Sequence, residues 1–201
     1  MGVNNKEDLA KLEKQFQEEM RKKFLKKGVT LIDPSSVFFS KDTKIGKDVV
    51  IYPNVYFGQG VKIGDKATIK SFCHIEFTKI GNSSVIGPFA RLRDNNEIGN
   101  NAKVGNFVEV KKSKISRNVK ISHLSYVGDS VIEKNSNIGA GTITCNYDGF
   151  KKNRTYIGEN CFIGSNTSLI APIKIKRNSV IGAGTVVDKN IQEGSVVYRK
   201  S

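Results

Sequence analysis

The chain of 201 residues has two histidines, the side chains best suited to acid and base chemistry near neutral pH. His74 ends the segment Ile69–His74 and is predicted to point outward, where a solvated surface role is the simpler interpretation. His123 lies just before a polar stretch of the chain, which makes it the better candidate for a site. Two histidines cannot supply the three ligands of a carbonic anhydrase zinc site, so that chemistry is excluded.

The polar stretch from Ile138 to Thr155 interrupts a regular sequence repeat. Hydrophobic residues recur every six positions up to Thr142, and the pattern resumes at Ile157. The residues between these two points are rich in Asn, Tyr, Asp and Lys, so they are expected to leave the repeating body as a loop. Loops on a rigid scaffold are common places for binding and catalytic residues.

Other reactive side chains are less well placed for chemistry. The cysteines Cys73, Cys145 and Cys161 have no metal-ligand spacing and are predicted to be reduced thiols. The chain lacks a nucleophile-elbow motif, so a serine or cysteine nucleophile is not favoured. No metal site is predicted.

The net charge of +14 can reflect either attraction of anions or lysines on solvated faces, and it leaves small anionic ligands open. The lysines are scattered, and no aromatic-interleaved motif of an RNA-binding module occurs, so nucleic acid is not a predicted partner. No stretch is apolar for long enough to span a bilayer, and the N-terminal residues do not resemble a signal peptide. We therefore expect a soluble, cytoplasmic protein that does not bind membranes.

Residues 5–27 are predicted to form one helix, with Asn5 as its N-cap and Gly28 at its end. An apolar stripe along this helix is predicted to pack against the rest of the chain. The stripe consists of Leu9, Leu12, Phe16, Met20 and Phe24.

The six-residue repeat that follows predicts the rest of the fold. A period of six fits neither one long helix nor a flat sheet. It fits a coil of three short strands per turn, in which each strand points one large aliphatic and one small residue inward. Glycine and asparagine then serve the corners, where positive φ is needed. The eight predicted coils begin at Ile45, Ile63, Ile80, Ile98, Ile115, Ile132, Ile157 and Ile175.

These coils form a prism with flat sides and one enlarged turn. Their starts lie 17 or 18 residues apart, except for a coil of 25 residues that holds the polar loop. The spacing does not decide the handedness of the coil. Because a prism offers no deep pocket of its own, we expect function in loops, corners and grooves between packed copies.

Three motifs carry a family resemblance. The segments Val104–Lys112, His123–Tyr126 and Ile138–Gly149 resemble the acetyltransferase half of the bacterial bifunctional N-acetylglucosamine-1-phosphate uridyltransferase/glucosamine-1-phosphate acetyltransferase family. The resemblance runs from about Gly2 to the end of the chain. It implies an all-β, left-handed parallel β-helix preceded by one helix, assembled as a homotrimer with sites at the subunit interfaces. It also implies transfer of an acetyl group from acetyl-CoA, as co-substrate, to the amine of glucosamine 1-phosphate, without a metal.

The resemblance assigns roles to individual residues. His123 corresponds to the general base that takes a proton from the attacking amine. Glu109 corresponds to the acid that orients and polarises this imidazole. The residues implied to bind the sugar phosphate are Arg93, Lys111, Tyr126, Asn137 and Lys152. The residues implied to bind acetyl-CoA are Asn146, Tyr147, Ser165, Ala183 and Lys200.

The chain also departs from the family pattern. The family's large N-terminal uridyltransferase domain has no counterpart, so uridyl transfer is expected to be absent or supplied by a separate uridyltransferase. Residues 1–28 correspond to the end of that domain and its linker helix. Residues 29–194 correspond to the β-helix, with the inserted loop at about 145–155, and 195–201 form a short tail. The family's basic C-terminal arm is represented only by the end of this tail, so weaker coenzyme A binding is expected.

A further departure concerns the expected phosphate site. Asp94 follows Arg93 where the family usually has proline, and it places an acid beside the residues expected to bind the phosphate. Two other functions remain open at this point. One is a hexapeptide acyltransferase that acts on another amino sugar, and the other is a trimeric scaffold without catalytic activity.

Overall fold

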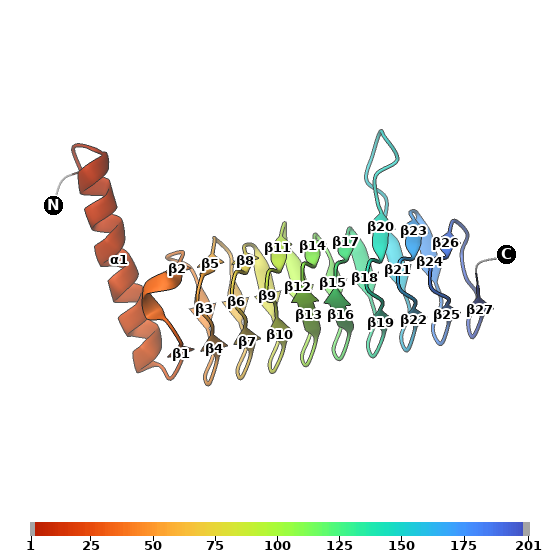
Figure 1. The fold of residues 1–201 in the computed structure, drawn as a ribbon, viewed down its shortest axis with the longest axis horizontal. Coiled ribbons are helices and arrows are strands. Elements are labelled where there is room, and N and C mark those ends of the chain that lie inside the picture. The colour runs from red at the N-terminus through yellow and green to blue at the C-terminus, as the bar shows by residue number, and fades with distance from the viewer. Residues whose placement is uncertain (1–2, 199–201) are drawn as a thin grey trace.

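The computed structural model describes residues 3–198, as one helix followed by a left-handed parallel β-helix (Figure 1). The chain winds through three parallel sheets, here named A, B and C, that form the sides of the prism. This architecture confirms the predicted fold class.

The strands of each sheet come from successive coils, in sequence order along the axis. Sheet A contains β1 (Thr30–Leu31), β4 (Val50–Ile51), β7 (Thr68–Ile69), β10 (Val85–Ile86), β13 (Lys103–Asn106), β16 (Lys120–His123), β19 (Asn137–Ile138), β22 (Phe162–Ile163), β25 (Val180–Ile181) and β27 (Val196–Val197). Sheet B contains β2 (Val37–Phe39), β5 (Val55–Phe57), β8 (His74–Ile75), β11 (Arg91–Arg93), β14 (Glu109–Lys111), β17 (Tyr126–Gly128), β20 (Ile143–Cys145), β23 (Ser168–Ile170) and β26 (Val186–Val187). Sheet C contains β3 (Lys44–Ile45), β6 (Lys62–Ile63), β9 (Thr78–Ile80), β12 (Asn96–Ile98), β15 (Lys114–Ile115), β18 (Ser130–Ile132), β21 (Thr155–Ile157) and β24 (Ile173–Ile175).

The core is a stack of aliphatic side chains, one from each short strand, as the six-residue period predicts. Ile69, Ile86 and Val104 are fully buried and follow one another in sheet A through the registers Ile69 to Ile86 and Ile86 to Val104. Burying an aliphatic side chain of this size contributes about 1.5–3 kcal/mol to folding. The small residues at the coil corners are buried too, and Ser84 Oγ donates to the Gly99 carbonyl at 2.8 Å.

The β-helix has about nine coils, one more than the eight predicted. The added coil begins with β1 and β2, which pair with β4 and β5. A 3₁₀ helix at Pro34–Ser36 separates these two strands and breaks the six-residue spacing, so the repeat does not reveal them. At the other end β27 pairs with β25, so sheet A continues past residue 194.

Helix α1 (Lys6–Lys26) matches the predicted helix to within one residue at each end. Asn5 caps it by accepting a hydrogen bond from the Asp8 amide at 2.8 Å. Only part of the predicted apolar stripe packs on the prism, because Leu9 is exposed whereas Met20 and Phe24 are buried. The helix crosses the end of the prism and projects beyond it (Figure 1). Gln17 fixes the contact, since its side chain exchanges two hydrogen bonds of 2.8 Å with the Phe39 main chain.

The corner between sheets A and B has one residue of positive φ in nearly every coil. We call these residues the A/B corner row. They are Asn54, Phe72, Phe89, Phe107, Leu124, Gly141, Asn166 and Gly184. Glycine and asparagine adopt this conformation readily, whereas phenylalanine and leucine rarely do.

The polar stretch forms the one long excursion visible in Figure 1, between β20 and β21. The prediction that these residues leave the repeating body is therefore confirmed. None of the helices in residues 3–198 is long and apolar enough to cross a membrane.

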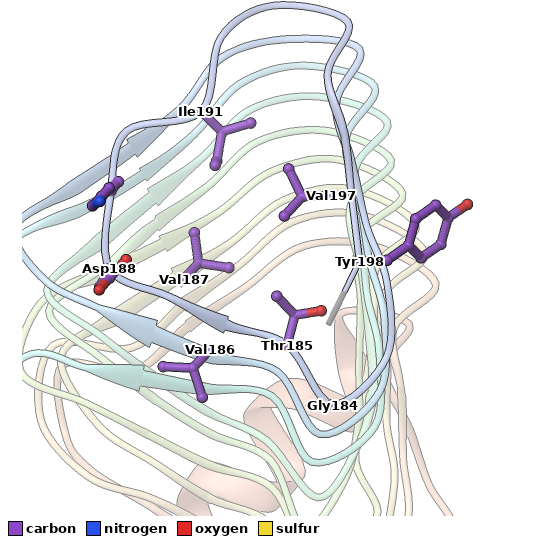
Figure 2. Close-up of a pocket in the computed structure, with 9 residues that line it drawn as sticks. Gly184, Thr185, Val186, Val187, Asp188, Ile191, Val197 and Tyr198 are labelled. Atoms are coloured by element: carbon purple, nitrogen blue, oxygen red, sulfur yellow. The ribbon is translucent and has the colours of Figure 1, made fainter. Parts of the chain in front are cut away.

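A cavity of about 760 Å³ lies at the C-terminal end of the prism. Figure 2 shows that Val187, Ile191 and Val197 point into the interior of the last coil, whereas Tyr198 points away from it. These side chains continue the aliphatic core, so the cavity is the end of the stack within the described residues and offers little for chemistry.

Candidate active site

The charged residues proposed for substrate binding lie in adjacent strands of sheet B. In the strand register Arg93 lies opposite Lys111, and Glu109 lies opposite Tyr126. Neighbouring strands are about 4.8 Å apart, so side chains at paired positions lie next to each other. The structure therefore brings together four predicted site residues that are up to 33 positions apart in the sequence.

Arg93 and Glu109 form the closest ion pair of this group. The Arg93 Nε donates to Glu109 Oε1 at 2.7 Å, with both side chains more than two-thirds buried. The hydrogen bond to Glu109 is the main reason that the pKa of Arg93 is raised above its usual value. Glu109 thus holds the guanidinium in place and charged.

Asp94 lies between the two cations of this group. Its Oδ2 is 3.0 Å from Arg93 Nη1 and 3.5 Å from Lys111 Nζ. The expectation that Asp94 places an acid beside the predicted phosphate-binding residues is confirmed.

The corner that presents Asp94 is held from inside the prism. Asp94 and Asn95 both have positive φ, at 62° and 65°. Behind them the buried Asn96 donates from Nδ2 to the Arg93 carbonyl at 2.9 Å and the Val110 carbonyl at 3.0 Å. Its Oδ1 accepts from the Ser113 amide at 3.0 Å. Because Asn96 links the main chain of Arg93 to that of Val110 and Ser113 in the next coil, the corner at Arg93 and Asp94 is fixed.

His123 ends β16 on the edge between sheets A and B, and its Nδ1 is hydrogen-bonded to Asn106 Oδ1. An amide oxygen only accepts, so Nδ1 is the donor of this hydrogen bond, which leaves Nε2 as the ring nitrogen outside it. In this structure Asn106 contacts Nδ1 and Glu109 contacts Arg93, so the role of Glu109 toward His123 stays a prediction. The register explains the difference, because Asn106 lies opposite His123 whereas Glu109 lies past the corner, opposite Tyr126.

A second polar cluster connects Tyr126 with the start of the loop. The buried Asn146 donates from Nδ2 to Asp129 Oδ2 at 2.6 Å and lies 3.4 Å from the Tyr126 hydroxyl. Asp129 is also buried, and its other oxygen lies 3.9 Å from Lys112 Nζ. Gly128 leaves room for this cluster, since a Cβ there would lie 2.5 Å from the Tyr126 hydroxyl oxygen.

The loop places Tyr147 and Lys152 side by side. The two residues form an antiparallel bridge, and Lys152 Nζ lies 4.3 Å from the centre of the Tyr147 ring. Asp148 closes the tip by accepting from the Lys151 amide at 2.8 Å, the Phe150 amide at 2.9 Å and Asn153 Nδ2 at 2.7 Å. These hydrogen bonds, led by that of Lys151, lower the pKa of Asp148 to about 2.

Five of the charged side chains line an open pocket of about 420 Å³. It is lined by Phe77, Asp94, Asn95, Lys111, Lys112, Asp129 and Lys152. Sheet B and the loop therefore contribute to one cationic pocket.

A row of small residues extends from His123 along the A/B edge. The carbonyl oxygens of His123, Ala140 and Ser165 each accept a hydrogen bond from the next coil, at 3.3, 2.7 and 2.7 Å. Ala183 occupies the same position one coil beyond Ser165, as the register of β22 and β25 shows. The predicted residues Ser165 and Ala183 thus share an exposed edge with His123.

Two predicted residues stand apart from these groups. Asn137 lies in sheet A, opposite Lys120 and Phe162, and so on a different side of the prism from Arg93 and Lys111. Lys200 lies outside the described residues.

Three residues with evident positions in the site were not predicted from the sequence. Asn96, Asn106 and Asp129 each contact a predicted site residue. The coil spacing could have found Asn106, because it lies 17 residues before His123 and thus in register with it.

The cysteines take no part in this site. All three are free thiols, and burial raises the pKa of Cys73 to about 11. Within residues 3–198 no group of three or more His, Cys, Asp or Glu side chains could hold a metal ion.

Comparisons with known families place this chain among hexapeptide-repeat proteins. Residues 42–76 and 77–112 match the family described as bacterial transferase hexapeptide (six repeats). Residues 154–189 match the hexapeptide repeat of succinyl-transferase.

Whole-chain relatives are proteins named bifunctional protein GlmU. That of Zymomonas mobilis is 52% identical over 200 residues, which cover 100% of this chain and 44% of the relative. That of Bradyrhizobium diazoefficiens is 56% identical over 200 residues, with the same coverage. That of Wolbachia pipientis is 54% identical over 199 residues, covering 99% of this chain and 46% of the relative. The chain thus spans about half the length of these relatives and matches their C-terminal part.

Solved structures share the fold at much lower identity. A UDP-N-acetylglucosamine acyltransferase from Campylobacter jejuni has a TM-score of 0.71 at 20% identity, covering 78% of this chain and 67% of that one. LpxA, a UDP-N-acetylglucosamine acyltransferase from Bacteroides fragilis, has a TM-score of 0.70 at 21% identity, covering 81% and 69%.

Proposed function

Since this chain belongs to the bacterial hexapeptide-repeat transferases and corresponds to the C-terminal part of the GlmU proteins, we propose that it is a glucosamine-1-phosphate N-acetyltransferase. It would transfer the acetyl group of acetyl-CoA to the amine of glucosamine 1-phosphate. The product, N-acetylglucosamine 1-phosphate, would serve the synthesis of UDP-N-acetylglucosamine and of cell-envelope precursors in the cytoplasm. The observation that carries the proposal is the cationic pocket that Lys111 and Lys152 help to line on the sheet B side, together with His123 at the end of β16 next to the same sheet.

His123 is the proposed general base. The substrate amine must be neutral to attack the thioester carbonyl, and it must lose a proton as the new C–N bond forms. Nε2 of the ring accepts this proton, because the hydrogen bond with Asn106 keeps Nδ1 protonated. The coenzyme A thiolate then leaves as the tetrahedral intermediate collapses.

Arg93, Lys111 and Lys152 are the proposed phosphate-binding residues. Lys111 and Lys152 line the same pocket, and Arg93 reaches its edge through the contact with Asp94. The Arg93 guanidinium is presented by Glu109, so we assign Glu109 the task of positioning this cation. Tyr126 and the Asp129-bound Asn146 would hold the sugar and the acetyl group.

The row formed by His123, Ala140, Ser165 and Ala183 is the proposed groove for acetyl-CoA. Its small side chains leave the edge of the prism open over several coils. Strands about 4.8 Å apart give it a length suited to an extended pantetheine chain that ends at His123. Tyr147 and Lys200 would be further contacts of the donor.

The chain is proposed to act as a homotrimer, with sites between subunits. Phe72, Phe89 and Phe107 stack along the A/B corner row, with ring centres 4.8 and 5.0 Å apart. Each ring is about half exposed, as is Leu124 in the next coil. A continuous apolar ridge of this kind is typical of an interface. A second copy packed on it could also bring Asn137 of its sheet A toward sheet B of the first.

An acetyl-transfer assay tests the proposed function. Acetyl-CoA consumption is measured with glucosamine 1-phosphate, with unphosphorylated glucosamine and with other amino sugars. We expect glucosamine 1-phosphate to be the best acceptor, because only it engages the cationic pocket. Equal rates with and without the 1-phosphate would favour an acyltransferase for another amino sugar. Absence of acetyl-CoA consumption and binding would favour the non-catalytic scaffold.

A further inference from the structure

The position between Arg93 and Lys111, where the proposed function places a phosphate, is taken by a carboxylate of the chain itself. Asp94 Oδ2 contacts Arg93 Nη1 at 3.0 Å and Lys111 Nζ at 3.5 Å. One oxygen in contact with two cations is the arrangement that a phosphate oxygen adopts in a site of this kind. Asp94 therefore competes with any anion for these two side chains.

The main chain holds Asp94 at this position, but its side chain is free to leave. The positive φ of Asp94 and Asn95 and the hydrogen bonds of Asn96 fix the corner. The Asp94 side chain is 44% exposed, compared with 24% for Arg93 and 21% for Lys111. A rotation about its own side-chain bonds thus moves the carboxylate into water while the cations stay in place.

The other carboxylates of the site lack this freedom. Glu109 is tied to Arg93 Nε at 2.7 Å, on a different nitrogen from the one that Asp94 contacts. Asp129 is buried and bound by Asn146 at 2.6 Å. Asp94 is therefore the carboxylate of this group that an entering anion can displace most readily.

We propose that Asp94 is an internal counter-ion of the anion site, which a phosphorylated ligand must displace in order to bind. It lowers the affinity of the site for phosphate groups and limits the preference for phosphorylated over unphosphorylated acceptors. The proposal rests on the proposed function only in taking a sugar phosphate as the ligand, because the competition applies to any phosphate.

The substitution Asp94→Asn removes the charge and keeps the shape of the side chain. Asparagine is well tolerated at positive φ, so the corner is expected to stay folded. The matched control is Asp48→Asn, because Asp48 is also an exposed corner residue with positive φ, at 55°, but lies in a coil remote from the site. Thermal unfolding of both variants checks that the fold is retained.

Calorimetric titrations of the full chain use inorganic phosphate, glucosamine 1-phosphate and glucosamine as probes. We expect Asp94→Asn to bind the two phosphorylated probes roughly three- to tenfold more tightly, as fits the loss of a partly exposed ion pair. Its affinity for glucosamine should change less. Asp48→Asn should bind all three probes as the parent chain does.

Equal or weaker phosphate binding by a folded Asp94→Asn variant would overturn the proposal, and so would undetectable phosphate binding in both proteins. An equal gain in affinity for glucosamine would also contradict the proposal, because Asp94 is proposed to compete with the phosphate group and glucosamine has none. If phosphate affinity rises as expected but glucosamine 1-phosphate is not acetylated, the counter-ion stands and the proposed function fails.

Discussion

The two halves of the A/B corner row have the same backbone geometry and opposite side chains. After Asn54 at its start, the row consists of Phe72, Phe89, Phe107 and Leu124 up to and including the His123 coil. After it the row consists of Gly141, Asn166 and Gly184. His123 directly precedes Leu124, so it stands where the bulky half meets the small half.

The bulky half is costly for an isolated chain. A residue other than glycine or asparagine at positive φ costs about 1–2 kcal/mol. Stacking of aromatic pairs returns about 0.5–1.5 kcal/mol per pair, and the half-exposed rings leave apolar surface in water. The folding of one chain does not explain this choice, whereas contact with a second copy in the proposed trimer would. The small half has no such cost and leaves its edge open for a ligand.

The largest expected effect concerns the residue at the junction. We predict that His123→Ala lowers the turnover number by roughly 10² or more, because the attacking amine loses its base. Steady-state kinetics at saturating substrates measure this, and light scattering checks that the assembly is unchanged. His74→Ala is the matched control, because His74 is an exposed histidine on sheet B several coils away. Unchanged turnover in His123→Ala would remove this residue from the mechanism.

The next prediction tests whether the bulky half of the row forms the interface between subunits. The double substitution Phe89→Asn and Phe107→Asn relieves backbone strain and removes two stacked rings. We expect the folded chain to persist and the concentration for trimer dissociation to rise roughly 30-fold or more, the effect of losing an interface hot spot. Analytical ultracentrifugation measures this shift.

Phe77→Asn provides the control for assembly. Phe77 also has positive φ and an exposed ring, but it lies at the corner between sheets B and C. A trimer that is as stable in the double variant as in Phe77→Asn would show that the stacked rings do not form the interface.

Most of the fold could be predicted from the sequence, because the β-helix has one dominant sequence period. The inward positions follow from the six-residue spacing, since every hexad must bury the same face of a strand. The extra coil at the N-terminal end was missed because the 3₁₀ turn at Pro34–Ser36 lengthens the spacing between the buried residues Leu31 and Phe39, so Leu31 falls out of the repeat.

The site was harder to predict than the fold, because its contacts join residues one coil apart. The motif resemblance pointed to His123 and Glu109 as a pair. The register instead pairs His123 with Asn106, since the corner at Phe107 lies between Asn106 and Glu109. The contacts of Arg93 with both Glu109 and Asp94 depend on side-chain directions that the spacing alone does not give.

A third prediction fills the small half. Ala183→Phe places a ring on the proposed acetyl-CoA groove, and we expect the KM for acetyl-CoA to rise about tenfold, as for overpacking of a fitted surface. The KM for glucosamine 1-phosphate should change less, because its pocket lies on sheet B and the loop. Arg177→Phe is the control, since Arg177 holds the equivalent exposed position at another corner of the prism. Equal KM values for acetyl-CoA in the two variants would place the donor elsewhere.

The smallest expected effect concerns the loop between β20 and β21, which leaves the prism at the corner between sheets B and C. Asp148→Asn weakens the closure of the tip, and we expect the KM for the sugar phosphate to rise about two- to threefold, since Lys152 is held less firmly.

The pH dependence of loop order gives a sharper readout than the KM. The pKa of Asp148 is lowered from 3.8 to about 2, so its contribution to loop order is fully present above pH 3.8 and is lost as the pH falls through 2. Hydrogen exchange of the Phe150 and Lys151 amides, corrected for the intrinsic rate, should show this loss in the parent chain and not in Asp148→Asn. The same pH profile in both proteins would mean that a group other than Asp148 closes the tip.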